Sequence, residues 1–523
     1  MNFEKLALLI LVGTVFFHAL VNFYILDQSR LLRENDEEGY IYESIEFYQK
    51  LISGQPEYGA IATGLWHEYS SRGFIHYAEG LILIFLNKID LKDVNLMIVL
   101  TNAFFLLILL IATYKIGSLL YNKKVGLLAA VLLSFSPQLF SHLRLNMLDF
   151  PVAAMVSLFF LCLLKTNRLT STFFSLLSGI IFMLAEATKE TAVIFIFPVV
   201  LFYFFTSLSF REKRKRRVIN FIIIFILLFS RVAMVYFCNN RFLMRYGLWK
   251  IFWKNNAGDI FYYIKSIPLY YFGLILSIAL ILPLFSYALN IRKRNKFLFS
   301  WLFIPFLLFS FSINKTSRFL LPALPPFFLL LIAELFTRVS KFRRVYIPIL
   351  FALAIFQYAI LSFFPNLSAL YPKFEMGLLS IKKDPEFYKF ERLMSIFAQE
   401  QSLSSKKNRV VFTAYTSYSN VLDYEFKIKN MPFFVDRSQR EILTNLNPPR
   451  IKDLRKYLLT ADYVVDNTDA PWECAGPLEE MTRALKENLR LNYKMYIKIG
   501  GFNIENKKSI NVYKRIKKYG AAS

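Results

Sequence analysis

The stretch from residue 172 to residue 209 reads TFFSLLSGIIFMLAEATKETAVIFIFPVVLFYFFTSLS, two apolar runs separated by a charged turn from Glu186 to Thr191. Each run approaches the ~20 residues that an α-helix needs to cross the hydrocarbon core of a bilayer. A charged interruption between two such runs is typical of a tight turn between transmembrane helices or of a pocket wall. The stretch therefore predicts a helical hairpin in a membrane.

Apolar runs of this kind recur from the N-terminus to about residue 363. Of the 523 residues, 56% are hydrophobic and 19% are charged, against roughly 25% charged in average soluble proteins. This composition excludes an ordinary cytosolic enzyme and predicts a mainly α-helical polytopic membrane protein. We expect about 11 transmembrane helices, over residues 5–26, 94–114, 125–142, 150–164, 172–187, 191–209, 218–237, 267–290, 297–312, 319–337 and 345–363.

Two parts of the chain lack such runs. Residues 27–93 form a polar first loop, in which the short apolar segment 75–86 suits an interfacial helix better than a span. From about Pro365 the composition becomes that of a soluble domain, with predicted strands at 410–414, 431–436 and 461–466 and a predicted helix at 477–489. We therefore expect a transmembrane domain over residues 1–363 and a small soluble α/β domain over residues 364–523.

The basic residues set the expected orientation. Lys and Arg number 63 against 37 Asp and Glu, a formal charge of +26 that in a soluble chain would suggest nucleic acid. Here they gather in alternate short loops, as in the run from Arg211 to Arg217, which is typical of cytoplasmic loops and of contact with anionic lipid. The bias predicts a multi-pass protein of the plasma or inner membrane with a cytoplasmic N-terminus. The first loop and the C-terminal domain would then lie on the outer, exoplasmic face.

Ionisable residues at the outer face are the candidates for chemistry, because charges near a membrane are costly. Asp36 and Glu37 belong to the densest acidic cluster, where a carboxylate near a hydroxyl can act as a general base, although such a cluster can also simply start a helix. Asp149 lies directly before a span, and its position alone favours a helix cap, which needs no function. Lys189 lies in the charged turn, and Arg318 lies before a Pro-rich turn, where an arginine can bind phosphate oxygens bidentately.

The order of these features resembles membrane glycosyltransferases of the GT-C fold. The closest resemblance is to the branch that contains the protein O-mannosyltransferases and the lipid A aminoarabinose transferase. It rests on the acidic pair and tyrosines after the first span, on Ser136-Pro137 through Arg144 to Asp149-Phe150-Pro151, on Lys189, and on Arg318-Phe319-Leu320-Leu321-Pro322. It covers residues 1 to about 363, and the C-terminal domain only by position and size.

This resemblance implies a function. Members of the family pass a sugar from a polyprenyl-phosphate carrier to an acceptor lipid, glycan or protein on the outer face, and direct displacement predicts inversion at the anomeric carbon. By resemblance, Asp36 matches the catalytic acid of the first loop, with Glu37 as its partner, and Asp149 matches the acid of the second loop. Arg72, Lys189 and Arg318 would bind the carrier phosphate. Many relatives carry His-Pro-Pro or Lys-Pro-Pro near Arg72, and this chain keeps the basic residue without the prolines.

No cofactor is expected. The chain has no Gly-rich nucleotide loop, and its four histidines are not paired at ligand spacing, so we predict no metal site. Asp36 and Glu37 could still share a divalent ion with phosphate oxygens. The expected partners are the lipid-linked donor, the acceptor and membrane lipids, and not nucleic acid. The alternative functions are a transporter or lipid flippase, against which the lack of repeated halves counts, and a non-catalytic assembly protein.

Overall fold

The computed structural model describes residues 2–29, 35–52, 73–86, 91–238, 259–280, 295–312, 315–338, 343–364, 366, 379–380, 387–401, 408–412, 433–435, 461–467, 496–504 and 508–515. Contacts divide the chain into two compact units. The first comprises Met1–Ser29 and Glu43–Lys382, and the second comprises Arg30–Tyr42 and Lys383–Ser523. The first unit extends beyond residue 363, and the first half of the first loop's opening helix groups with the second unit. The predicted domain boundary at 363/364 stays a proposal.

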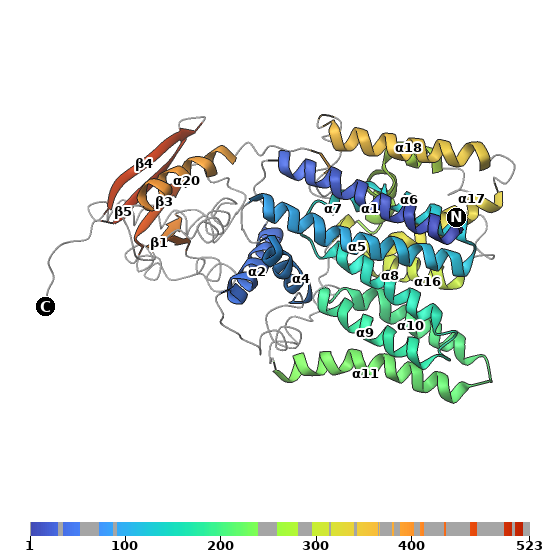
Figure 1. Cartoon of the computed structure of the whole chain (residues 1–523). Coiled ribbons are helices and arrows are strands. Elements are labelled where there is room, and N and C mark those ends of the chain that lie inside the picture. Colours follow the sequence, from blue (N-terminus) through green and yellow to red (C-terminus); the bar gives the residue numbers. More distant parts are fainter. Residues whose placement is uncertain are drawn as a thin grey trace. The chain divides into compact units, whose positions relative to one another are not determined.

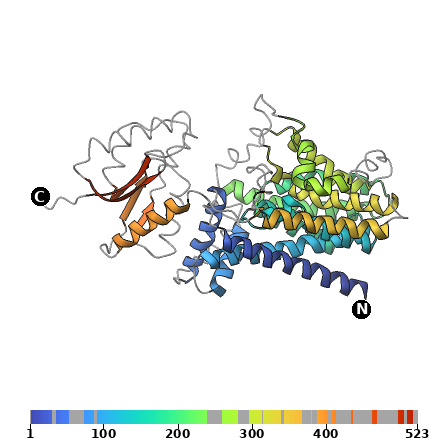
Figure 2. The same cartoon turned by 90° about the horizontal axis from the view of Figure 1, so that it is seen from above.

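The first unit is a bundle of helices that run side by side (Figures 1 and 2). Its elements are α1 (Phe3–Gln28), the second half of α2 (Asn35–Ile52), α4 (Gly73–Leu86), α5 (Leu91–Leu120), α6 (Lys123–Ser134), α7 (Pro137–His142), α8 (Asp149–Lys165), α9 (Thr172–Thr188), α10 (Ala192–Leu208), α11 (Arg214–Cys238), α14 (Tyr262–Ser266), the π-helix η1 (Ile267–Tyr271), α16 (Lys296–Ser310), the 3-10 helix η3 (Ser317–Ala323), α17 (Leu324–Arg338) and α18 (Arg343–Phe363).

Most of these helices lie where the apolar runs predict them, and α4 occupies the predicted interfacial segment. Within the described residues, four helical stretches are long and apolar enough to cross a membrane: Phe3–Gln28, Asp93–Leu120, Ser317–Phe336 and Arg344–Phe363. Helices α9, α10 and α16 are apolar but shorter. The number of spans, about 11, and the side on which each loop lies therefore stay predictions.

Two predicted spans are interrupted. The run 125–142 breaks between α6 and α7 at Ser136, whose Oγ donates to the carbonyl of Tyr271 at 2.5 Å. Pro137, the first residue of α7, has no backbone N–H to continue the preceding helix. The run that begins at Ile267 opens with η1 and then turns at Gly273, whose φ is +73°. A Cβ there would lie 2.5 Å from the side-chain nitrogen of Gln357, so only glycine fits both the backbone and the space.

Helix α5 forms the centre of the bundle and packs against α1, α6 and α8. Its contact with α6 is a backbone-to-backbone approach: a Cβ on Gly117 would lie 2.5 Å from the Cα of Gly126, and one on Gly126 would lie 2.3 Å from the carbonyl oxygen of Tyr114. Small residues at such crossings allow helices in membranes to pack closely.

Side-chain bonds identify the two ends of this bundle. At one end, Asn95 near the start of α5 donates to the carbonyl of Leu26 near the end of α1, at 3.3 Å. Asn102, two turns further along α5, donates to the carbonyls of Leu143 and Leu145, at 3.0 and 2.9 Å. The loop before Asp149 therefore lies at the end where α1 finishes. At the opposite end, Glu4 pairs with Lys123 at 3.0 Å.

The second unit contains a five-stranded mixed sheet in the order β2-β1-β3-β5-β4. Its elements are α20 (Phe387–Gln401), β1 (Asn408–Phe412), β2 (Phe433–Val435), β3 (Tyr463–Asn467), β4 (Tyr496–Ile504) and β5 (Lys508–Arg515). Strand β1 pairs in parallel with β2 and β3, whereas β5 pairs antiparallel with β3 and β4. Phe397 of α20 packs against the rings of Phe433 and Tyr463.

The three predicted strands of this unit overlap β1, β2 and β3, whereas the β4–β5 hairpin was not predicted. Its sequence contains the pair Gly500-Gly501, which follows a register shift between Lys498 and Gly500, and glycines usually weaken a strand pattern. The predicted helix at 477–489 lies outside the described residues.

Candidate active site

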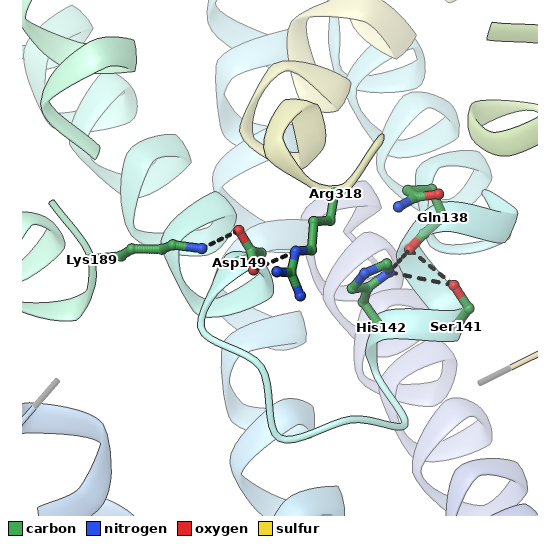
Figure 3. Close-up of polar contacts among 6 residues, drawn as sticks. All are labelled: Gln138, Ser141, His142, Asp149, Lys189 and Arg318. Carbon is green, nitrogen blue, oxygen red and sulfur yellow. Dashed lines mark hydrogen bonds and ion pairs between the residues drawn. The ribbon is translucent and has the colours of Figure 1, made fainter. Parts of the chain in front are cut away.

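Three residues that are far apart in the sequence meet at one carboxylate (Figure 3). The ammonium nitrogen of Lys189 lies 2.5 Å from Oδ1 of Asp149, and Nε of Arg318 lies 3.8 Å from Oδ2. The Asp149 side chain is 6% exposed, that of Lys189 is 18% exposed and that of Arg318 is 27% exposed. The two cations are thus closer to solvent than the acid that joins them.

Local structure explains how each residue reaches this point. Asp149 is the first residue of α8. Lys189 follows the last residue of α9 in an extended conformation, with φ −162° and ψ 133°, and the chain turns there into α10. The charged turn predicted between the two apolar runs is confirmed.

Arg318 lies on η3, and two hydrogen bonds from other elements hold that short helix in place. The hydroxyl of Tyr271 donates to the carbonyl of Ser317 at 2.9 Å, and the indole N–H of Trp301 donates to the carbonyl of Pro322 at 3.0 Å. Tyr271 also receives the hydrogen bond from Ser136. The break between α6 and α7 is therefore linked, through Tyr271, to the segment that carries Arg318.

The charges of Lys189 and Arg318 decide the protonation state of Asp149, which lies just before the predicted span 150–164. Burial raises the pKa of this carboxyl, but Lys189 and Arg318 outweigh burial, and the pKa lies below its ordinary value. Asp149 is therefore ionised at neutral pH. The ring of Phe319 lies below both cations, 5.5 Å from the Lys189 ammonium and 5.9 Å from the Arg318 guanidinium.

His142 lies beside this cluster and was not predicted as a site residue. Its Nδ1 lies 2.8 Å from the carbonyl oxygen of Gln138 and 3.4 Å from the hydroxyl of Ser141 (Figure 3). It is close enough to Asp149 and Arg318 to interact electrostatically with both. A single histidine in an apolar run carries no signal of its own, so the sequence did not indicate it.

Arg144, in the loop between α7 and α8, is fully buried. Its guanidinium donates to Asn22 at 2.9 Å, to Ser362 at 2.8 Å and to the carbonyl of Leu379. These bonds join the loop to α1, to α18 and to the chain that follows α18. Arg144 therefore fixes the position of the loop that ends at Asp149.

The other predicted site residues are less completely described. Asp36 and Glu37 lie in the first turn of α2, and Glu37 is buried. The side chain of Asp36 and the whole of Arg72 lie outside the described residues. Among the described residues, no group of three or more His, Cys, Asp or Glu side chains could hold a metal ion.

An apolar cavity of about 280 Å³ lies in the same unit. Its walls come from η1, α16, η3 and α17, and they include Tyr271, Phe303, Leu320 and Leu324. Leu320 is two residues from Arg318 on η3, so the cavity and the charged cluster share one short helix.

Comparisons with known proteins agree with this architecture. Residues 81–236 match the family model of the dolichyl-phosphate-mannose-protein mannosyltransferases. The structure is similar to that of ArnT from Cupriavidus metallidurans bound to undecaprenyl phosphate, with a TM-score of 0.60 and 13% identity over 98% of this chain and 99% of that one. It is also similar to the archaeal oligosaccharyltransferase AglB from Archaeoglobus fulgidus, in complex with an inhibitory peptide and a dolichol-phosphate. That TM-score is 0.55, with 12% identity over 98% of this chain and 74% of that one.

No curated protein sequence matches the chain. The apo state of the same ArnT gives a similar result, with a TM-score of 0.59 and 13% identity over 96% of this chain and 97% of that one. The likeness thus extends over nearly the whole chain, including the second unit. From the family match and these structures together, the chain has the GT-C fold of membrane glycosyltransferases.

Proposed function

We propose that this protein transfers a sugar from a polyprenyl-phosphate-linked donor to an acceptor lipid, glycan or protein at the outer face of the membrane. The observation that carries the proposal is the meeting of Lys189 and Arg318 on Asp149 in a chain of this fold. Two cations held at the end of a bundle of apolar helices suit the phosphate of a lipid carrier, because a phosphate oxygen accepts charged hydrogen bonds from both.

In this proposal Asp149 positions the cations. Its pKa lies below the ordinary value, so it is a weak base, and both of its oxygens face a cation. An ionised and enclosed carboxylate is well suited to hold Lys189 and Arg318 in a fixed geometry before the donor arrives. The more exposed cations then contact the phosphate, together with Arg72 of the first loop.

The apolar cavity supports a lipid-linked donor. Its walls are aliphatic and aromatic, and one of them is η3, which also presents Arg318. An isoprenoid segment placed against Leu320 and Phe303 would keep its phosphate near the cations.

The chemical step requires a base and a leaving group. By the family resemblance, Asp36, which Glu37 follows in the sequence, would accept the proton of the acceptor hydroxyl as the acceptor oxygen attacks the anomeric carbon. The bond between that carbon and the phosphate oxygen breaks, and the carrier phosphate leaves with the electron pair, stabilised by the cations. This single displacement inverts the anomeric configuration.

The test uses purified full-length protein with a radiolabelled polyprenyl-phosphate sugar and a panel of lipid, glycan and protein acceptors. We expect label to appear in one acceptor class, and Lys189→Gln to reduce the transfer strongly. The matched control is Lys265→Gln, which breaks a surface ion pair of 2.6 Å with Asp259. A protein that moved intact donor across a vesicle without transferring label to any acceptor would be a transporter, and the proposal would fail.

A further inference from the structure

A second cluster of charge lies away from the candidate active site. It comprises the loop between α8 and α9 and the loop between α10 and α11. Because α8 has 17 residues, its last residue, Lys165, is about 25 Å along the helix axis from Asp149. The two clusters therefore lie at different ends of the bundle.

Hydrogen bonds join the two loops into one structure. Nε of Arg217, on α11, donates to the carbonyl of Arg168 at 3.1 Å, and the side-chain amide of Asn220 donates to the carbonyl of Leu169 at 2.8 Å. The backbone N–H of Arg168 donates to the hydroxyl of Tyr203, on α10, at 3.0 Å. Arg217 is buried and also donates to the carbonyl of Glu212 at 2.6 Å. It organises both loops and is itself covered.

The loop between α8 and α9 has an uncommon backbone. Asn167, Arg168 and Leu169 are consecutive and all left-handed, with φ of 49°, 58° and 63°. None is glycine, and such residues each cost roughly 1–2 kcal/mol in that conformation. Thr166 compensates in part, because its Oγ1 accepts from the N–H of Leu169 at 2.9 Å. The loop is thereby held in one conformation.

That conformation fixes the Arg168 side chain. Its guanidinium carbon lies 3.7 Å from the centre of the Phe210 ring, which belongs to the other loop. Stacking of this kind orders a guanidinium while leaving its N–H groups at the edge for an anion. Arg168 is exposed, so its side chain is accessible to a ligand.

Around Arg168 the surface is strongly basic. We call this set the basic surface: it consists of the exposed residues Lys165, Arg168, Arg211, Lys213, Arg214, Lys215 and Arg216. The acid of the two loops, Glu212, contributes its backbone carbonyl to Arg217. In the part of the chain that the structure describes, none of the basic surface residues is in an ion pair. Their mutual repulsion would be relieved by a bound anion.

Apolar side chains border the basic surface on the same helices. Phe173 near the start of α9, Phe205 near the end of α10 and Ile219 near the start of α11 are 68%, 65% and 47% exposed. A free inorganic anion would make no favourable contact with these apolar side chains. A molecule with an anionic head and apolar tails matches both, because the head reaches the cations while the tails cover the exposed apolar residues.

We propose that the two joined loops form a binding site for the phosphate headgroup of an anionic phospholipid, with Arg168 at its centre. The site is independent of sugar transfer, since it is a helix length away from Asp149. Each basic residue near an anionic membrane surface contributes about fivefold in affinity.

The test titrates detergent-solubilised full-length protein with phosphatidylglycerol and counts bound lipids by native mass spectrometry. Phosphatidylcholine gives the baseline. We expect Arg168→Gln/Arg214→Gln to weaken phosphatidylglycerol binding by about 25-fold. Because Arg168 also shapes its loop, a second variant, Arg214→Gln/Lys215→Gln, alters exposed side chains only and should weaken binding by a similar factor.

The matched control is Lys115→Gln/Lys123→Gln. It removes the same charge from another basic region, where both lysines pair with Glu4, at 4.0 and 3.0 Å. We expect binding within about twofold of the unchanged protein. An equal loss of phosphatidylglycerol binding in this control would mean that binding depends only on the net charge of the protein, and it would overturn the proposal. Displacement of the lipid by millimolar inorganic phosphate would also overturn it, in favour of a free-anion site.

Discussion

The ion cluster at Asp149 makes a quantitative prediction about stability. Replacing Asp149 with Asn keeps the size of the side chain but removes its charge, so that Lys189 and Arg318 face each other without a counter-ion. In a fully buried pair, loss of one partner costs ~3–5 kcal/mol. Here the cations are 18% and 27% exposed, so water screens part of this cost. We expect a loss near the ~1.5–3 kcal/mol of a charged hydrogen bond.

A double-mutant cycle isolates the interaction. In Lys189→Gln, Asp149 keeps Arg318 as a partner, so the same Asp149→Asn change should cost at least ~1 kcal/mol less than in the unchanged protein. The assay is equilibrium unfolding in mixed detergent micelles. The control cycle uses Asp259→Asn and Lys265→Gln, an ion pair whose side chains are 43% and 70% exposed, where coupling should stay below ~0.5 kcal/mol. Additive effects at Asp149 and Lys189 would refute the reasoning.

The pKa of Asp149 also predicts how the effect of Asp149→Asn on stability depends on pH. Burial raises this pKa, but Lys189 and Arg318 lower it by more, so that it lies below its ordinary value. A carboxylate with a depressed folded pKa stabilises the protein above its unfolded pKa, ~3.9, and the contribution is lost as the pH falls through the folded value. The stability difference between Asp149→Asn and the unchanged protein should therefore be constant from about pH 5 to pH 8. A change within that range would mean that Asp149 titrates there.

Other predictions concern the chemistry, the packing and the topology. Asp36→Asn should lower sugar transfer by about 10² to 10⁴ without affecting membrane insertion, measured with labelled donor, and near-normal turnover would move the base elsewhere. Arg318→Ala should weaken donor binding roughly ten- to a hundredfold and Arg318→Lys should recover part, whereas unchanged donor affinity would exclude a phosphate contact. Gly126→Ala should lower the melting temperature, because its Cβ would lie 2.3 Å from the carbonyl oxygen of Tyr114, whereas Gly13→Ala meets nothing within 4 Å and should be neutral. A C-terminal tag should be accessible from outside the cell and an N-terminal tag should not, and the reverse protease-protection pattern would invert the proposed topology.

The positions of most helices were predictable because each corresponds to an apolar run. The turn at Lys189 is an example: a charged segment between two apolar runs has few structural alternatives. The breaks at Ser136 and Gly273 were not predicted, although Pro137 is a local signal for the first of them. Their geometry depends on a hydrogen bond to Tyr271 and on packing against Gln357, residues that lie far away in the sequence.

The charged residues of the candidate site were predictable from the sequence, but their contacts with one another were not. Asp149, Lys189 and Arg318 could be selected from the sequence because each is a charged residue next to an apolar run, where charge is costly. Their contact with one another could not be derived from those positions, since it depends on how α8, α9 and η3 pack. His142 gave no signal, because its relation to Asp149 exists only after α7 has folded.

The sequence alone therefore determined the helical membrane architecture, the family resemblance and the residues most costly to place near a membrane. These follow from hydrophobicity and charge, which act residue by residue. Only the tertiary structure decided that Asp149 joins two cations and that Arg217 joins two basic loops. Each of these arrangements is a long-range contact, which depends on the packing of helices that local sequence patterns do not specify.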